Sequence, residues 1–320
     1  MTAISAEPAQ SSPEPARRPG RLRFPAFIAH DVGGLVGTVI LTLVVLVALF
    51  GPEFAPHPYT AILGIPGHGP AAGAPLGLDY IGRDVFSRLL DGGRTTLIMG
   101  GAATILIYAV GIAVGLTAGY AQSIADPVLM RIVDIFLSFP ALLVMLLFVT
   151  AFGSSPVVLV GAAAIVLFPG VARIVRTATA EIMTRSYVEA AVSWGERAFA
   201  IMRREVLPNI VAPIVADLGV RFSWAIILIA SVNYLGLGLK PPTADWGLMI
   251  SENREIISTN PLSVLAPAAM LALLVIGVNL LGDAYVRQRG RSGGSSGGRP
   301  AGRFGGRLRR SSSTRTGGAR

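Results

Sequence analysis

Long runs of apolar residues alternate with short polar segments along most of this chain. Each run approaches the roughly 20 residues that an α-helix needs to cross the hydrocarbon core of a bilayer. The runs cover Val32 to Phe50, Thr95 to Tyr120, Ile135 to Phe152, Val157 to Val175, Ile210 to Leu235 and Leu262 to Leu281. This pattern predicts an all-α integral membrane protein with six transmembrane helices.

The polar segments between these runs divide the chain into regions. Both ends are rich in Arg and in small or turn-forming residues without periodicity, which is typical of disorder. The predicted regions are a disordered cytoplasmic tail (1–30), a first transmembrane helix (31–55), an extracellular loop (56–94), a five-helix core (95–286) containing a cytoplasmic polar loop (177–210), and a disordered tail (287–320).

The end of the extracellular loop carries a short amphipathic pattern. One helical face carries Val85, Phe86, Leu89 and Leu90, and the opposite face carries Ser87, Arg88 and Asp91. This spacing predicts a short interfacial helix that lies on the membrane surface before the second span.

The composition agrees with a protein that lies in lipid. Hydrophobic residues make up 52% and charged residues 14%, whereas soluble domains carry roughly 25% charged residues. The absence of cysteine excludes disulfides, thiolate metal sites and thiol redox chemistry. The net charge of +9 resides in the last segment, where ten arginines follow from Arg287 onward, so a nucleic-acid-binding function is unsupported.

The distribution of charge also predicts the orientation. Six spans place both termini on one side, and Lys and Arg concentrate in cytoplasmic segments. The two tails and the loop at 177–210 are basic, whereas acidic residues accompany the basic ones in the longest loops of the other face. Both termini are therefore predicted to be cytoplasmic.

The polar loop between the fourth and fifth runs has its own folding signals. Ser186 and Glu189 have the spacing of a capping box. Gly195 lies where the chain must turn, and Pro208 and Pro213 are expected to kink or end the next helix. Two helices that meet at a glycine form a projecting surface of defined shape on which a partner protein can dock. The alternative is an amphipathic helix that rests on the lipid headgroups.

These residues resemble the EAA loop of binding-protein-dependent ABC importer permeases. Four further blocks are similar to the dipeptide, oligopeptide and nickel branch of that family, in its second ("C") subunit. They are LGLDYIGRDVFSRLL, MRIVDIFLSFP, LGLGLKPPTADWG and NLLGD, and the resemblance runs from about residue 24 to 286. It implies the type I ABC importer permease fold and a multi-pass position in a bacterial plasma membrane.

The resemblance also implies two groups of functional residues. The first would couple the permease to an ATPase and comprises Ser186, Glu189, Ala190, Ala191, Gly195, Leu207 and Pro208. The second is an outer-loop signature and comprises Gly236, Gly238, Pro241, Pro242, Trp246 and Gly247. Lys240, Asp245 and Trp246 could contact the binding protein or close over the pathway, or they could only fold the loop, with Trp246 as an anchor at the membrane interface.

The implied assembly pairs this chain with a homologous permease subunit, as a heterodimer, with two cytoplasmic ABC ATPases and with an extracellular substrate-binding protein. The chain has no Walker motif. It is therefore expected to be a transporter subunit rather than an enzyme and to hold no cofactor, while ATP and Mg²⁺ bind to the partner ATPases. Two positions depart from the family pattern, Glu205 in the coupling loop and Ile229 in the fifth span.

Two ionisable groups lie within the fifth apolar run. Asp217 and Arg221 are four residues apart and share one helical face. Charged groups inside a membrane usually face a cavity or a partner. The pair could line the pathway and meet the charged ends of a peptide, or it could be a structural pair near the cytoplasmic edge.

The predicted function is the import of di- or oligopeptides through half of a translocation pathway. Nickel or another small solute is an alternative, but His57 and His68 lie on a loop without metal-ligand spacing, and no metal site is predicted. A channel or ion-coupled carrier is the rival from another class. A carrier usually shows repeats around buried charges, which are not evident here.

Overall fold

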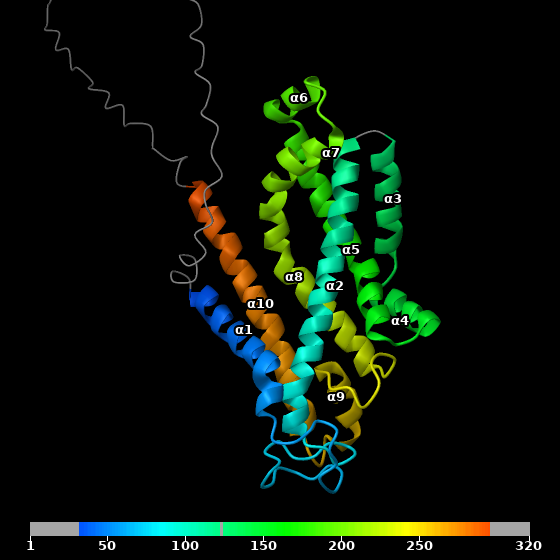
Figure 1. Cartoon of the computed structure of the whole chain (residues 1–320), viewed down its shortest axis with the longest axis vertical. Coiled ribbons are helices and arrows are strands. Elements are labelled where there is room, and N and C mark those ends of the chain that lie inside the picture. The colour runs from blue at the N-terminus through cyan, green and yellow to red at the C-terminus, as the bar shows by residue number, and fades with distance from the viewer. Residues whose placement is uncertain (1–31, 122–123, 295–320) are drawn as a thin grey trace, which may run out of the picture.

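The computed structural model describes residues 32–121 and 124–294, and these are almost entirely helical. The helices are α1 (Val32–Phe50), α2 (Val85–Ala121), α3 (Ala125–Ser138), α4 (Ala141–Phe152), α5 (Pro156–Met183), α6 (Ser186–Ser193), α7 (Ala198–Ile201), α8 (Leu207–Tyr234), α9 (Trp246–Asn253) and α10 (Leu262–Gly294). Helices α2, α5 and α8 run side by side along the long axis, with α1 and α10 together on one flank (Figure 1).

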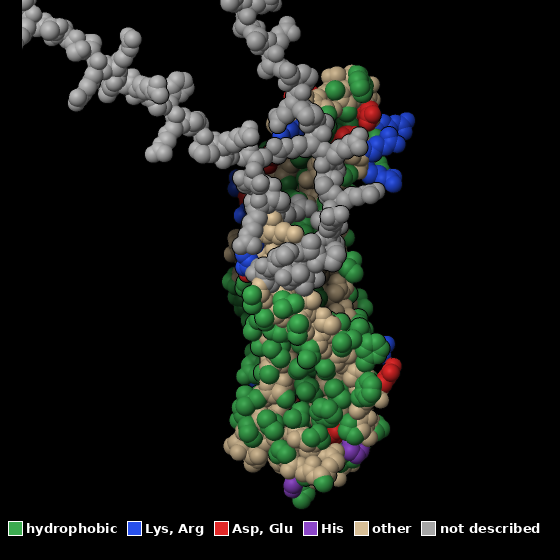
Figure 2. Space-filling view, turned by 90° about the vertical axis from the view of Figure 1, so that its left-hand side faces the viewer, with side chains coloured by type: hydrophobic (Ala, Val, Ile, Leu, Met, Phe, Trp, Pro, Cys, Tyr) green, Lys and Arg blue, Asp and Glu red, His purple; other side chains and the backbone are tan. Residues whose placement is uncertain are grey.

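The two ends of this bundle differ in character. One end carries α6 and α7, and the other carries α9 and the loop that precedes α2 (Figure 1). We call them the α6 end and the α9 end. Hydrophobic side chains cover the middle of the face in Figure 2, whereas Lys and Arg gather toward the α6 end. That distribution agrees with the predicted cytoplasmic position of the α6 end, since basic residues concentrate on that side.

Within residues 32–121 and 124–294, five helical segments are long and apolar enough to cross a membrane, and a bent pair makes a sixth if it forms one span. The pair is α3 and α4, which meet at an angle of 89°. The prediction of one continuous span from Ile135 to Phe152 was therefore wrong. Phe139 precedes Pro140 and is extended, with φ −94° and ψ 142°, because the proline ring disfavours helical backbone in the residue before it.

The predicted interfacial helix was also wrong, because Val85 begins the 37-residue helix α2. Asp84 starts this helix by accepting hydrogen bonds from the backbone N–H groups of Phe86 and Ser87, both at 3.1 Å. Ser87 and Arg88, expected on a polar outer face, are fully buried. The amphipathic pattern therefore marks the buried start of a membrane helix.

A cluster of buried charges explains how Arg88 is accommodated. Arg88 Nη1 lies 2.6 Å from Asp79 Oδ2 and 2.7 Å from Glu252 Oε2. Arg83 contacts the same two carboxylates, at 2.6 and 3.2 Å. Two positive and two negative groups make the cluster neutral, which offsets the large cost of burying each charge alone. The cluster joins the loop before α2 to α9.

The contact between α2 and α5 depends on three glycines spaced four residues apart. A Cβ at Gly115 would lie 2.6 Å from the carbonyl oxygen of Ala172 and 2.6 Å from Val175 Cβ. Gly111 and Gly119 meet α5 at similarly short range, one turn before and one turn after. Small residues at this spacing let two membrane helices pack backbone against backbone.

The predicted tail at 1–30 and residues 295–320 of the other tail lie outside the described residues. Helix α10 continues to Gly294, so residues 287–294 are helical, whereas disorder was predicted for them. The described ends of α1 and α10 both point toward the α6 end (Figure 1), as an even number of membrane crossings requires.

The glycine contact leads to a first prediction. Gly115→Val should lower the free energy of unfolding by about 1–3 kcal/mol or more, because overpacking forces the two helices apart. Gly101→Val is the matched control, since no atom lies within 4 Å of a Cβ at that position of the same helix. Thermal unfolding of both variants in detergent tests this, and equal unfolding midpoints would contradict the proposed role of the contact.

Candidate coupling loop and pathway-lining surface

The candidate coupling loop consists of α6, a turn at Gly195, and α7. Helix α7 passes through a π-helical turn, Met202–Val206, directly into α8. The apolar segment Ala198–Tyr234 is therefore one helical body of 37 residues. Helix α7 is thus joined to the membrane-spanning helix α8 without an intervening loop.

The predicted capping box does not form. The N-cap of α6 is Arg185, with extended backbone and no side-chain hydrogen bond, and Ser186 is the first helical residue. The backbone N–H of Glu189 instead donates to the carbonyl oxygen of Arg185 at 3.1 Å. Apolar packing holds the helix in place, because Val188 and Ala191 are buried in the same cluster as Ile201 of α7.

Gly195 adopts the backbone conformation that the turn requires. Its φ is +75°, a left-handed conformation that costs a side-chain-bearing residue roughly 1–2 kcal/mol. Its N–H donates to the carbonyl oxygen of Val192 at 3.0 Å. No atom lies within 4 Å of a Cβ placed there, so the requirement for glycine is conformational rather than steric.

The tip of the loop exposes large apolar side chains. Trp194 is 83% exposed and Phe199 is 71% exposed. Glu189, Glu196 and Arg197 are also exposed beside them. Exposed aromatic groups rimmed by charges are typical of a docking surface, and their position at the extremity of the α6 end suits a partner beyond the membrane (Figure 1).

The Leu207–Pro208 pair lies at the start of α8. Pro208 is the second residue of α8 and directly follows the π-helical turn Met202–Val206, and Pro213 lies inside the helix. Of the two outcomes expected from sequence, a kink or an end, neither proline ends the helix. The backbone carbonyl of Glu205 accepts a hydrogen bond from Asn209 Nδ2 at 2.6 Å.

The outer-loop signature forms a compact connection between α8 and α9. Gly236 has a φ of +77° and turns the chain after α8, and the Pro241–Pro242 peptide bond is cis. Gly238 lies so close to Asn233 that a Cβ would overlap it, and a Cβ at Gly247 would lie 2.8 Å from Ala230 Cα. These residues fold the loop back onto the end of α8.

Trp246 lies inside the protein rather than at the membrane interface. Its side chain is fully buried, and its Nε1–H donates to the carbonyl oxygen of Leu89 at 2.9 Å. Gly93 makes room for the ring, since a Cβ there would lie 2.6 Å from it. Trp246 therefore fixes α9 against the start of α2, which corrects the interpretations as an interfacial anchor or as a surface contact.

Asp245 is the second buried anchor of this connection. It caps α9 by accepting from the N–H of Leu248 at 3.1 Å, and it accepts from Asn233 Nδ2 at 2.8 Å. Thr96 Oγ1 lies 2.8 Å from its other oxygen. Burial raises the pKa of this carboxyl despite these hydrogen bonds.

The pair predicted in the fifth span forms an ion pair. Arg221 Nε donates to Asp217 Oδ2 at 2.9 Å. Tyr108 of α2 donates to the same oxygen at 3.0 Å. The structure thus brings together Asp217 and Arg221 with a residue of another helix, far along the long axis from the coupling loop's tip.

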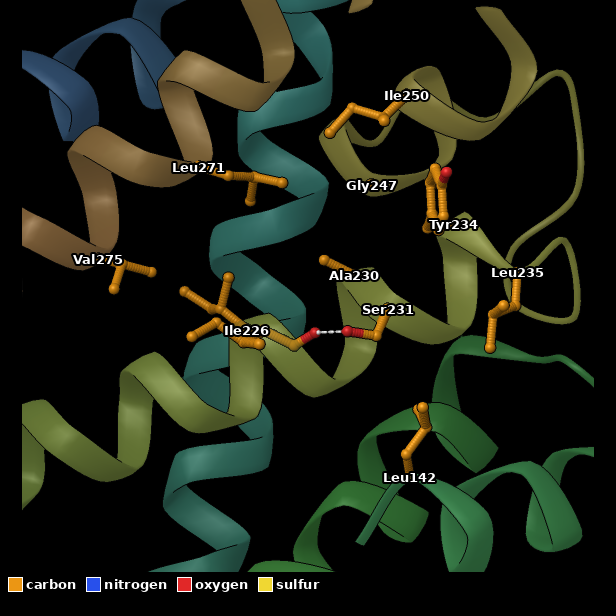
Figure 3. Close-up of a pocket in the computed structure, with 11 residues that line it drawn as sticks. Leu142, Ile226, Ala230, Ser231, Tyr234, Leu235, Gly247, Ile250, Leu271 and Val275 are labelled. Carbon is orange, nitrogen blue, oxygen red and sulfur yellow. Dashed lines mark hydrogen bonds between the residues drawn. The ribbon is translucent and has the colours of Figure 1, made fainter. Parts of the chain in front are cut away.

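An apolar recess lies near the α9 end, between α4, α8, α9 and α10 (Figure 3). Its volume is about 370 Å³. The hydroxyl of Ser231 donates to the carbonyl oxygen of Ile227 at 2.7 Å, so this polar group is already satisfied. The lining residues are Leu142, Ile226, Ile227, Ala230, Ser231, Tyr234, Leu235, Gly247, Ile250, Leu271 and Val275.

Several of these buried groups were not singled out from the sequence. Asn233 and Thr96 form hydrogen bonds with Asp245, and Tyr108 donates a hydrogen bond to Asp217. The only signal that could have found them is the occurrence of a polar residue inside an apolar run. His57 and His68 belong to no metal-binding cluster of the described residues: His57 Nδ1 lies 3.7 Å from Asp84, and His68 Nδ1 lies 2.9 Å from the carbonyl oxygen of Gly69.

Comparison with known proteins decides the family. Residues 111–290 match the model of the binding-protein-dependent transport system inner membrane component. The chain belongs to this family. It is a multi-pass inner-membrane permease subunit of a transport system whose assembly includes an ATPase and a binding protein.

Curated relatives span most of the chain. The Di/tripeptide transport system permease protein DppC of Pseudomonas aeruginosa is 36% identical over 80% of this chain and 86% of its own length. The Glutathione transport system permease protein GsiD of Pectobacterium atrosepticum is 34% identical, over 83% and 89% respectively. A solved structure of the MetNI methionine ABC transporter, in an inward-facing conformation, aligns with a TM-score of 0.52 at 22% identity over 62% of this chain and 95% of that chain, which supports the type I permease fold.

The turn at Gly195 generates a second prediction. Gly195→Val should abolish uptake while leaving membrane insertion intact, because valine disfavours a positive φ and the angle between α6 and α7 would change. Gly195→Asn is the control, since asparagine tolerates this conformation. Uptake is measured alongside the amount of protein in the membrane, and wild-type uptake by the valine variant would contradict the lever role.

The buried carboxyl of Asp245 generates a third prediction. The folded state holds its pKa above the unfolded value, so the free energy of unfolding should fall as pH rises through the folded-state pKa. Asp245→Asn should remove this dependence and keep the hydrogen bonds. Asp245→Ala should destabilise by about 1–3 kcal/mol, because Asn233 loses its partner.

Thermal unfolding in detergent at pH 5 and pH 8 measures both variants of Asp245. The advantage of the asparagine variant over wild type should grow from pH 5 to pH 8. A constant difference between the two proteins would show that Asp245 is ionised in the folded state throughout.

Proposed function

We propose that this chain forms half of the translocation pathway of an ATP-driven importer for di- or oligopeptides, with a homologous permease subunit as the other half. Two of its relatives are named for the transport of di/tripeptides and glutathione, and glutathione is itself a tripeptide. Two cytoplasmic ATPases hold ATP and Mg²⁺, and an extracellular binding protein delivers the peptide. The chain itself contributes no cofactor and no catalytic group.

The observation that carries the coupling mechanism is the continuity of α7 with α8. The aromatic tip of the loop seats in a cleft of the ATPase, and closure of the two ATPases moves the coupling loops together. Because Ala198–Tyr234 is one helical body, movement at the tip rocks α8 as a rod. The pathway-facing surface of α8 then alternates between the two sides of the membrane.

The surface that α8 presents to the pathway suits a permissive importer. The recess near the α9 end is almost wholly apolar, and it offers contact area without a dense set of directional hydrogen bonds. Such a surface lets peptides of different sequence pass, and the binding protein supplies most of the selectivity.

A fourth prediction tests the docking of the loop. The chain has no cysteine, so a single cysteine gives an unambiguous crosslink. Glu196→Cys, at the exposed tip, should crosslink through a bis-maleimide to cysteines placed in the ATPase cleft. Thr60→Cys, exposed on the loop before α2, is the control and should give none.

The same experiment includes purification through a tag on this chain. An importer subunit should bring down two ATPase copies and a second permease subunit. Purification without any ATPase, together with no crosslink from a full scan of cleft positions, would reject the proposed assembly.

A further inference from the structure

Arg221 is only partly hydrogen-bonded within the membrane-spanning part of the described chain. Its Nε donates to Asp217, and within residues 32–121 and 124–294 its two terminal nitrogens donate no hydrogen bond. A guanidinium carries five N–H donors, so four remain available. The side chain keeps 19% of its surface exposed, and these donors therefore reach a surface of the subunit.

Gly170 of α5 makes the space in which this guanidinium lies. A Cβ at Gly170 would come within 2.5 Å of Arg221 Nη1 and 2.7 Å of Nη2. Asp217 holds the other edge of the guanidinium, and Tyr108 holds Asp217. Three helices, α2, α5 and α8, thus fix one edge and one face of the group and leave its terminal nitrogens free.

The position of the group along its helix places it within the membrane-spanning part of the chain. Arg221 lies thirteen residues from Tyr234 along α8, and Gly170 lies fourteen from Pro156 along α5. At 1.5 Å per residue, both are roughly 20 Å from the α9 end of their helices. That depth falls within the hydrocarbon core of about 30 Å, where an arginine faces a cavity or a partner rather than lipid.

The exposed face of α8 runs beside this group. Val220, Trp224, Ile227 and Tyr234 are exposed and recur every three, four or seven residues, so they form one stripe. Arg221 and Asp217 lie at its edge, and the recess of Figure 3 lies on its α9-end half. No described part of the chain covers this stripe.

We propose that Arg221, set in the space left by Gly170, is a transient binding site for the carboxylate of the transported solute. The inference rests on the proposed function, for which the solute is a peptide with a free C-terminal carboxylate. The fork of terminal N–H groups matches the two oxygens of a carboxylate. Asp217 and Tyr108 position the guanidinium, and the negative charge of Asp217 keeps the affinity low enough for release.

The test uses the full transporter with its binding protein in proteoliposomes. Gly170→Ala displaces the guanidinium without changing any charge, and Gly161→Ala in the same helix is its matched control, since no atom lies within 4 Å of a Cβ there. The double variant Arg221→Gln with Asp217→Asn removes the site at constant net charge. The probes are trialanine and trialanine amide, each normalised to wild-type uptake.

Both site variants should lower trialanine uptake about tenfold or more, as expected for loss of a hydrogen-bonded charge, and should change amide uptake little. Gly161→Ala should transport both probes normally. Equal loss of both probes, or no loss of either, would overturn the inference. Reduced recovery of the second permease subunit would show that Arg221 instead pairs with a carboxylate of that subunit.

A second measurement does not need the amide as a substrate. A cysteine at Val220, on the stripe beside Arg221, is labelled with maleimide during turnover. Trialanine should slow the labelling in the otherwise wild-type chain and not in the Gly170→Ala chain, and equal protection overturns the inference. If the wild type imports no peptide at all, the proposed function fails first, and this inference fails with it.

Discussion

The close contact between α2 and α5 is the constraint on which the rest of the structure depends. Gly111, Gly115 and Gly119 have no side chains, and this allows the backbone of α2 to pack directly against α5. In lipid there is no hydrophobic drive to bring helices together, so close packing supplies the attraction. This contact holds α2, which begins beside the cluster of buried charges, against α5, which leads into the coupling loop.

Two groups of paired charges differ in how completely the protein encloses them. Near the α9 end, Arg83 and Arg88 are paired with Asp79 and Glu252, and the four side chains keep at most 6% of their surface exposed. Deeper, Asp217 is paired with Arg221 but leaves 19% of the arginine side chain exposed. Enclosed pairs give a rigid anchor, whereas a partly exposed pair leaves N–H donors for a group that is not part of this chain.

The sequence predicted what depends on composition and length, and failed where tertiary contacts decide. The run from Val32 to Phe50 is the helix that hydropathy predicts. The Ile135–Phe152 run is broken at Pro140, because local backbone sterics outweigh hydropathy. Arg88 looked exposed on a helical wheel, because its carboxylate partners lie outside α2, one in Asp79 of the preceding loop and one in Glu252, 164 residues away, and no helical pattern reports such contacts.

The candidate functional residues also divide into those that local sequence predicts and those that depend on tertiary contacts. Gly195 was predicted from local chemistry, and its φ of +75° agrees, because a turn between two helices is a local event. The space that Gly170 leaves for Arg221 depends on how α5 crosses α8. The coupling loop and this guanidinium lie on the same helical body, since α7 continues into α8. A movement that opens the pathway therefore also moves Arg221 relative to α5, which links release of a bound carboxylate to the position of the lever.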